Sequence, residues 1–308
     1  MLTFSGVDFM GKKRIAFALS MLLLAISVGS IFTKGLNFGI DFTGGVLIEV
    51  AYPDVADLSQ IRSGLESAGF GSAKLQNFGT ARDVLIRLLP QEGTKSSDAV
   101  GEQILAVLAA QDPAVILRRV EFVGPQVGEE LREQGGLAML FALLFIMASV
   151  AFRFQWKFSV GAVAALAHDV IITVGFFSVF DQPFDLAVLA AVLAVIGYSL
   201  NDTIVVFDRI RENFLRIRKS HALEVMNVSI NQTLSRTLIT SMTTLLVLSA
   251  LFFLGGEAIH AFALALIVGV VVGTYSSIYV ASSLALTLEV STQDLMPPAT
   301  DKELDEMP

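Results

Sequence analysis

Three ionisable side chains lie inside long apolar stretches of this sequence: Asp169, Asp202 and Arg236. A charged side chain at membrane depth costs about 2.5 to 3.5 kcal/mol on insertion scales, so each one needs a partner or a function. A carboxyl group can bind and release a proton, and an arginine remains charged and acts on a nearby acid. If these stretches are membrane helices, the three residues predict a proton relay.

The surroundings of the two acids favour Asp202 as the main proton site. Asp169 lies about 11 residues into its apolar stretch, or ~16 Å at 1.5 Å per residue, close to the centre of a bilayer. Asp202 is expected nearer the inner surface, but Ser199, Asn201 and Thr203 make its stretch polar. We therefore predict Asp202 as the proton site, with these three as polar neighbours and Asp169 as an alternative relay site.

Arg236 stands at the cytoplasmic mouth of the fifth apolar stretch, and Thr240 follows at helical spacing. Because the fourth and fifth stretches enter the membrane from the same side, Asp202 and Arg236 have compatible depths. They can pair directly or interact through water. A static ion pair is the structural alternative, and threonine hydroxyls often bond only to the preceding turn.

The elements that must position these residues are membrane helices. Of the 308 residues, 54% are hydrophobic and 16% charged, and the mean hydropathy is +0.69, a balance typical of integral membrane proteins. Stretches long enough to cross a hydrocarbon core of ~30 Å predict six spans. They cover residues 15–33, 137–152, 158–180, 186–207, 237–254 and 259–288.

Small residues in the last stretch predict close helix packing rather than a pore. They are Gly269, Gly273, Ser276 and Ser277.

The distribution of Lys and Arg predicts the orientation. They gather before the first stretch, between the second and third, and after the fourth, whereas residues 181–185 and 255–260 contain none. The positive-inside rule then places residues 1–14 and an acidic tail, 289–308, in the cytoplasm. A cleaved signal peptide is the alternative for the first stretch, which is long for one.

Residues 34–136 are then predicted to be extracytoplasmic. Apolar patterns there indicate strands over 46–52, 73–78, 83–89 and 114–123, and two helices, the first capped by Asp54 with Val55 on its apolar face. The order βαββαβ predicts a ferredoxin-like α+β domain. The fold class is therefore an α-helical membrane protein with one such domain.

The entrance to this domain reads "LNFGIDFTGG", with Gly39, Asp41, Gly44 and Gly45. Glycine permits positive φ, so these residues form either an ordinary turn-rich linker or a backbone joint between the first span and the domain. We predict the joint.

Composition excludes several classes of protein. The formal net charge is −8 and there is no Cys, so nucleic-acid binding is not indicated, and disulfides and thiolate metal sites are absent. The domain holds no catalytic constellation. No enzyme activity, metal or cofactor is predicted.

Four motifs follow one another along the chain: "FGIDFTGG", "GYSLNDTIVVFDRIREN", "SRTLITSMTTLL" and "GTYSSIYVAS". Together they resemble the SecF branch of the SecD/SecF protein-export family over nearly the whole chain. The resemblance implies a multi-pass protein of the bacterial inner membrane that uses the proton motive force to promote export. It implies SecD, the SecYEG channel, YajC and secreted preproteins as partners. It also places the family's intramembrane acid on Asp202 and its arginine on Arg236.

Two other functions remain open. SecF proteins resemble half of a resistance-nodulation-division exporter, but about 100 external residues leave little room for a small-molecule pocket. A passive subunit that stabilises the channel without moving ions is the third reading.

Overall fold

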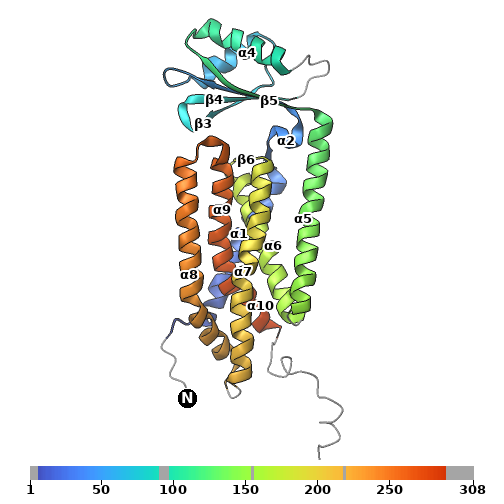
Figure 1. The fold of residues 1–308 in the computed structure, drawn as a ribbon, viewed down its shortest axis with the longest axis vertical. Coiled ribbons are helices and arrows are strands. Elements are labelled where there is room, and N and C mark those ends of the chain that lie inside the picture. The colour runs from blue at the N-terminus through green and yellow to red at the C-terminus, as the bar shows by residue number, and fades with distance from the viewer. Residues whose placement is uncertain (1–5, 90–96, 154–155, 218–219, 289–308) are drawn as a thin grey trace, which may run out of the picture.

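A bundle of long helices with a small α/β domain at one end makes up the molecule (Figure 1). The computed structural model describes residues 6–89, 97–153, 156–217 and 220–288. The acidic tail predicted at 289–308 lies outside these residues. Six helices of the described chain are long and apolar enough to cross a membrane, as predicted. They are α1 (Lys13–Thr33), α5 (Pro125–Arg153), α6 (Trp156–Val179), α7 (Leu186–Arg216), α8 (Ala222–Leu254) and α9 (Glu257–Ser276), the last continued by η2 (Ser277–Ala281) and α10 (Ser282–Thr287).

The helices extend beyond the apolar stretches that predicted them. Helix α5 begins at Pro125 rather than near residue 137, and α8 begins at Ala222 rather than near 237. Hydropathy marks the part of a helix that lies in hydrocarbon, whereas backbone hydrogen bonding continues into the charged turns on either side. In the last span, the π-helical segment η2 interrupts the regular helix.

Close packing around α6 and α7 forms the centre of the bundle. The rings of Phe158 and Phe207 lie 4.8 Å apart there, both fully buried. A Cβ atom at Gly269 would come within 2.1 Å of a Val195 methyl, and one at Gly273 within 3.0 Å of the Ser199 Cβ. The packing predicted for these two glycines is confirmed.

The α/β domain consists of one antiparallel sheet with its helices on one face. The strands lie in the order β3-β4-β2-β5, and Ile48 and Ile86 pack against Leu65 and Leu108 from the two helices. The opposite face of the sheet is turned toward the helix bundle (Figure 1). Along the chain the elements are β2 (Gly45–Ala51), α3 (Leu58–Ser67), β3 (Lys74–Phe78), β4 (Thr80–Leu88), α4 (Ser97–Gln111) and β5 (Ile116–Val123).

The first helix of the domain starts later than predicted. Its N-cap is Asp57, whose side chain accepts from the backbone N–H of Ser59 at 2.8 Å, so the assignment of the cap to Asp54 is wrong. Val55 lies outside the helix and is 74% exposed. The reason is that the backbone N–H of Ala56 donates to the Ala81 carbonyl at 2.9 Å, which holds this segment extended beside β4.

The glycine motif forms a tight connection between α1 and the sheet. Gly44 and Gly45 have φ of +67° and +124°, and a Cβ at Gly45 would lie 2.1 Å from the Leu88 carbonyl oxygen. Gly39 instead has an ordinary φ of −66°, and a Cβ there would lie 3.1 Å from the Asp185 Cβ. The short elements β1 (Asn37–Phe38) and α2 (Ile40–Thr43) precede the sheet, and β1 pairs in parallel with β6 (Pro183–Phe184), just before α7.

This packing predicts how alanine at the motif affects stability. Gly45→Ala adds strain at positive φ, roughly 1 to 2 kcal/mol, and a clash with Leu88 of about 1 to 3 kcal/mol. Gly69→Ala is the matched control, because Gly69 has φ +89° with no atom within 4 Å of the added Cβ. The thermal unfolding midpoint of the purified chain in detergent should therefore fall clearly further for Gly45→Ala. Equal decreases would show that the close approach does not matter.

Candidate functional site

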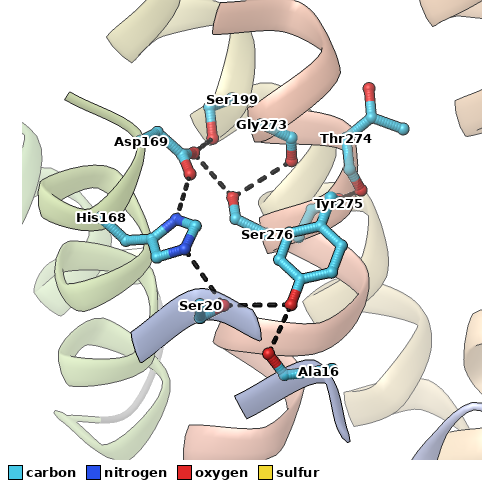
Figure 2. A network of polar contacts seen from close by, with 10 residues as sticks. Ala16, Ser20, His168, Asp169, Ser199, Gly273, Thr274, Tyr275 and Ser276 are labelled. Carbon is cyan, nitrogen blue, oxygen red and sulfur yellow. Dashed lines mark hydrogen bonds and ion pairs between the residues drawn. The ribbon is translucent and has the colours of Figure 1, made fainter. Parts of the chain in front are cut away.

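The carboxyl group of Asp169 is held by side chains from three helices in the core of the bundle. It lies on α6 and is 1% exposed. Its Oδ1 is 2.9 Å from Nδ1 of His168, and its Oδ2 accepts from the hydroxyls of Ser199 on α7 at 2.5 Å and Ser276 on α9 at 2.6 Å (Figure 2). Both oxygens of this buried acid therefore have fixed partners.

These contacts continue from Asp169 to α1. Nε2 of His168 is 3.1 Å from the hydroxyl of Ser20, which is 3.0 Å from the hydroxyl of Tyr275 on α9. The Tyr275 hydroxyl in turn donates to the carbonyl oxygen of Ala16 at 2.7 Å. We call Asp169, His168, Ser199, Ser276, Ser20 and Tyr275 the Asp169 network (Figure 2).

The carboxyl group of Asp202 on α7 differs from that of Asp169 in its hydrogen bonding. It is 3% exposed, and its Oδ2 has no hydrogen-bond partner within the described chain. The hydroxyls of Thr203 on the same helix and Thr237 on α8 are also buried and unpartnered among the described residues. Buried polar atoms are nearly always hydrogen-bonded, so such a group takes its partner from water, an ion or another subunit.

Arg236 supplies the positive charge that acts on Asp202. The side chain of Arg236 is exposed, and in the part of the chain that the structure covers no ion pair within 4.0 Å joins it to Asp202. The two residues are thus neighbours without a direct contact. A long, mobile guanidinium can approach or leave the acid without breaking a fixed bond.

The predicted polar neighbours are distributed differently from the expectation. Ser199 donates to Asp169 rather than serving Asp202, and Asn201 is exposed. The hydroxyl of Thr240 donates to the carbonyls of Arg236 and Thr237, which is the structural alternative for this threonine. Only Thr203 is a buried polar neighbour of Asp202 in the predicted sense.

Sequence reasoning missed part of the Asp169 network. Ser276 was assigned to packing alone, and Ser20 and Tyr275 were not singled out. Tyr275 is a polar residue inside an apolar stretch, which is a weak signal. The contact of Ser20 with His168 joins residues 148 positions apart, and no local pattern carries that information.

Asp41 connects the glycine motif directly to α7. Its Oδ2 accepts from the backbone N–H of Leu186, the first residue of α7, at 2.9 Å, while Asp185 accepts from the N–H of Val188 at 2.8 Å. Negative charge is favourable at a helix N-terminus, where backbone N–H groups are unpaired. Burial raises the pKa of Asp185, and the hydrogen bond from Val188 acts in the opposite direction. The helix that carries Asp202 therefore starts at the motif.

A second contact joins the sheet to the segment just before the glycine motif. Arg87 on β4 donates to Oδ1 of Asn37 at 2.6 Å and to the carbonyl oxygen of Phe38. Burial lowers the pKa of Arg87, and the charge of Asp181 raises it. Arg87 lines a cavity of about 500 Å³ between the free face of the sheet and the nearby ends of the helices, and Asp41 and Asp185 line the same cavity. The described residues contain no cluster of His, Cys, Asp or Glu able to hold a metal ion.

Comparison with known proteins gives consistent matches along the chain. Residues 103–291 match the family described as "Protein export membrane protein SecD/SecF, C-terminal", and residues 29–52 match the "SecD/SecF GG Motif". Protein translocase subunit SecF from Vibrio alginolyticus is 53% identical over 98% of this chain and 97% of its own length. The SecF subunit of Pseudomonas aeruginosa is 52% identical over 98% of both chains.

The chain is also similar to solved structures of SecDF. One, a translocon-associated membrane protein from Thermus thermophilus, superposes with a TM-score of 0.85 at 42% identity. A SecDF described as a super-membrane-facing form gives a TM-score of 0.69 at the same identity. The chain spans 39% of the length of each SecDF chain, of which it matches one part.

The different environments of the two acids predict different effects on stability. Asp169→Ala leaves the hydroxyls of Ser199 and Ser276 and a ring nitrogen of His168 without their partner, at about 1 to 3 kcal/mol per group. Asp202→Ala removes a carboxyl oxygen that already lacks a hydrogen-bond partner, so the loss of stability should stay within about 1 kcal/mol. Thermal unfolding of the two matched variants in detergent measures this difference. Equal destabilisation would contradict the assignment.

Proposed function

The chain belongs to the SecF family of protein translocase subunits, and from this membership we propose that it promotes protein export with SecD by using the proton motive force, with Asp202 as the proton-binding group. It is a multi-pass membrane protein and an accessory subunit of Sec-dependent export. The energy source, the proton site and the further partners are parts of the proposal.

The observation that carries the proposal is the unpartnered Oδ2 of Asp202 beside the charge of Arg236. An acid whose oxygens both have partners, such as Asp169, can change its protonation only together with those partners. An acid without them is free to exchange its proton when water reaches it. Asp202 thus meets the requirement of a relay that Asp169 does not meet alone.

Protonation of Asp202 is coupled to conformation through Arg236. An ionised Asp202 favours an arrangement with the guanidinium near, and a protonated Asp202 loses that attraction. A tenfold change in proton affinity between two arrangements corresponds to about 1.4 kcal/mol of bias between them. Modest movement of α8 relative to α7 therefore suffices to link proton transfer to motion.

The motion is passed outward along α7 to the glycine motif. Asp41 holds the first turn of α7, and Arg87 ties the sheet to β1 at the same point. Helices α1 and α5 also lead directly into the domain. A rigid connection at Gly44 and Gly45 transmits displacement better than a flexible linker.

We infer that the α/β domain is an extracytoplasmic ferredoxin-like domain and that the chain resides in the bacterial inner membrane. The order β3-β4-β2-β5 with both helices on one face supports the fold assignment. The basic residues Arg209, Arg211 and Arg216 near the end of α7 lie at the end of the bundle opposite the domain, which supports cytoplasmic termini.

The similarity to solved SecDF structures supports SecD as the partner that covers part of the exposed membrane surface. Helix α8 presents apolar side chains to the outside, among them Ile239, Met242 and Leu246, and Arg236 is exposed on the same helix. A neighbouring subunit can supply a partner for the exposed Arg236 at the end of its membrane span. SecYEG, YajC and secreted preproteins belong to the same proposal through the family.

Export by inverted membrane vesicles that lack the native subunit tests the function. With SecD and this chain restored, an imposed gradient should stimulate translocation of a preprotein after the ATP-driven step. Asp202→Asn and Arg236→Lys should reduce this stimulation at least tenfold while the ATP-driven part stays unchanged. Thr243→Val is the control, because within the described chain the Thr243 hydroxyl bonds to its own helix alone.

Each other outcome identifies a different function. Full gradient stimulation with a normally assembled Asp202→Asn subunit would indicate a passive role. A chain that assembles without SecD and moves small molecules would indicate half of an exporter.

A further inference from the structure

We propose that the Asp169 network stores one proton, and that this proton holds α1 against α9. The inference deepens the proposed ion coupling, on which it rests only for its role in export. It follows from counting hydrogens along the chain of contacts in Figure 2. Four hydrogen bonds link Asp169 to Ala16 through His168, Ser20 and Tyr275.

The direction of these bonds is fixed from the α1 end. The carbonyl oxygen of Ala16 can only accept, so the single hydroxyl hydrogen of Tyr275 is donated to it. Tyr275 then has no hydrogen for Ser20, and the Ser20 hydroxyl must donate to Tyr275. Ser20 in turn has none for His168, so Nε2 of His168 must carry a hydrogen and donate it to Ser20.

The remaining bond, between His168 Nδ1 and Asp169 Oδ1, also needs a hydrogen. With Nε2 already protonated, that hydrogen is either on the carboxyl group or is a second one on the ring. In both cases the pair holds one proton more than a neutral histidine beside an ionised aspartate. Both side chains are at most 3% exposed, and Oδ2 of Asp169 is occupied by two serine hydroxyls.

When this proton leaves, three hydrogens remain for four bonds. The ionised Asp169 attracts the one ring hydrogen to Nδ1, because a charged acceptor makes the stronger bond. Nε2 then becomes an acceptor, and the Ser20 hydroxyl turns to donate to it. The hydroxyl hydrogen of Tyr275 can no longer serve both Ser20 and Ala16, so one contact between α9 and α1 is lost.

The helix that loses this contact, α1, is the one that enters the external domain. Ser20 and Ala16 lie on α1, which leads to β1 and the glycine motif, whereas Tyr275 lies on α9 just before η2. Proton loss at His168 and Asp169 therefore removes one of the two hydrogen bonds by which Tyr275 holds α1. The helices packed against α6 carry three other titratable groups away from their ends: Tyr198 and Asp202 on α7 and Tyr279 on η2. The charged residues of α1 and α5, those of α7 from Asp208 onward, and His260 of α9 lie toward the helix ends.

The composition of the chain makes the proton count measurable. It has three histidines and no cysteine, so ¹⁵N-histidine NMR of the full chain in lipid nanodiscs gives few signals, and His168→Gln identifies that of His168. Nitroxide labels at Leu19→Cys on α1 and Val271→Cys on α9, both exposed positions, report the distance between the helices. We expect His168 to change from the Nε2–H to the Nδ1–H form as pH rises, and the distance distribution to shift over the same interval.

Removing the Tyr275 hydroxyl should separate the two events. In Tyr275→Phe the His168 form still changes with pH, but the distance does not, because no tie remains to be lost. Ser20→Ala is a second variant with the same expected result, since it disconnects His168 from Tyr275. Tyr279→Phe, whose ring lies 5.4 Å from that of Tyr275, is the control and should behave as the unmodified chain.

Three results would overturn the proposal: an Nε2–H form at every pH, a constant helix distance while the form of His168 changes, or a pH-dependent distance that persists in both Tyr275→Phe and Ser20→Ala. None of these measurements uses export. Failure here is therefore distinguishable from failure of the proposed function.

Discussion

The cost of burying carboxyl groups among apolar helices is the constraint on which this structure depends. The bundle meets it in two ways. Asp169 is surrounded by donors from α6, α7 and α9, which fixes how these helices pack at its centre. Asp202 lies one turn further along α7 from Ser199 and has an oxygen that no described residue binds. Asp169 thus links three helices of the bundle, and we propose Asp202 as the acid that exchanges protons during export.

Helix α7 joins the two ends of the molecule. Its first backbone N–H is bound by Asp41 of the glycine motif, and its middle carries Ser199 and Asp202. Helix α1 is the second connection, because it makes contacts with the Asp169 network and then enters the sheet. Both connections converge where Gly44 and Gly45 allow backbones to approach closely. A change of charge in the bundle therefore has two routes to the α/β domain.

The sequence predicted those features that depend on local pattern. Apolar length gave the six spans, and alternation gave the order of strands and helices in the domain. The local pattern failed at the start of α3, because Ala56 is held extended by a hydrogen bond to Ala81 of β4. The role of Asp41 at α7 and the contact of Ser20 with His168 were equally inaccessible, since each joins residues far apart in sequence. The intramembrane acids were found because charge is rare there, whereas their different states depend on which neighbours the fold brings to them.

The most direct test of the central claim is infrared difference spectroscopy of the full chain with SecD in lipid, recorded between acidic and alkaline pH. A protonated carboxyl group has a C=O stretching band that disappears on ionisation. The account predicts such a band, its loss in Asp202→Asn and its retention in the exposed control Asp54→Asn. An unchanged set of titrating bands in Asp202→Asn would contradict it, because Asp202 would then not be the group that takes up the proton.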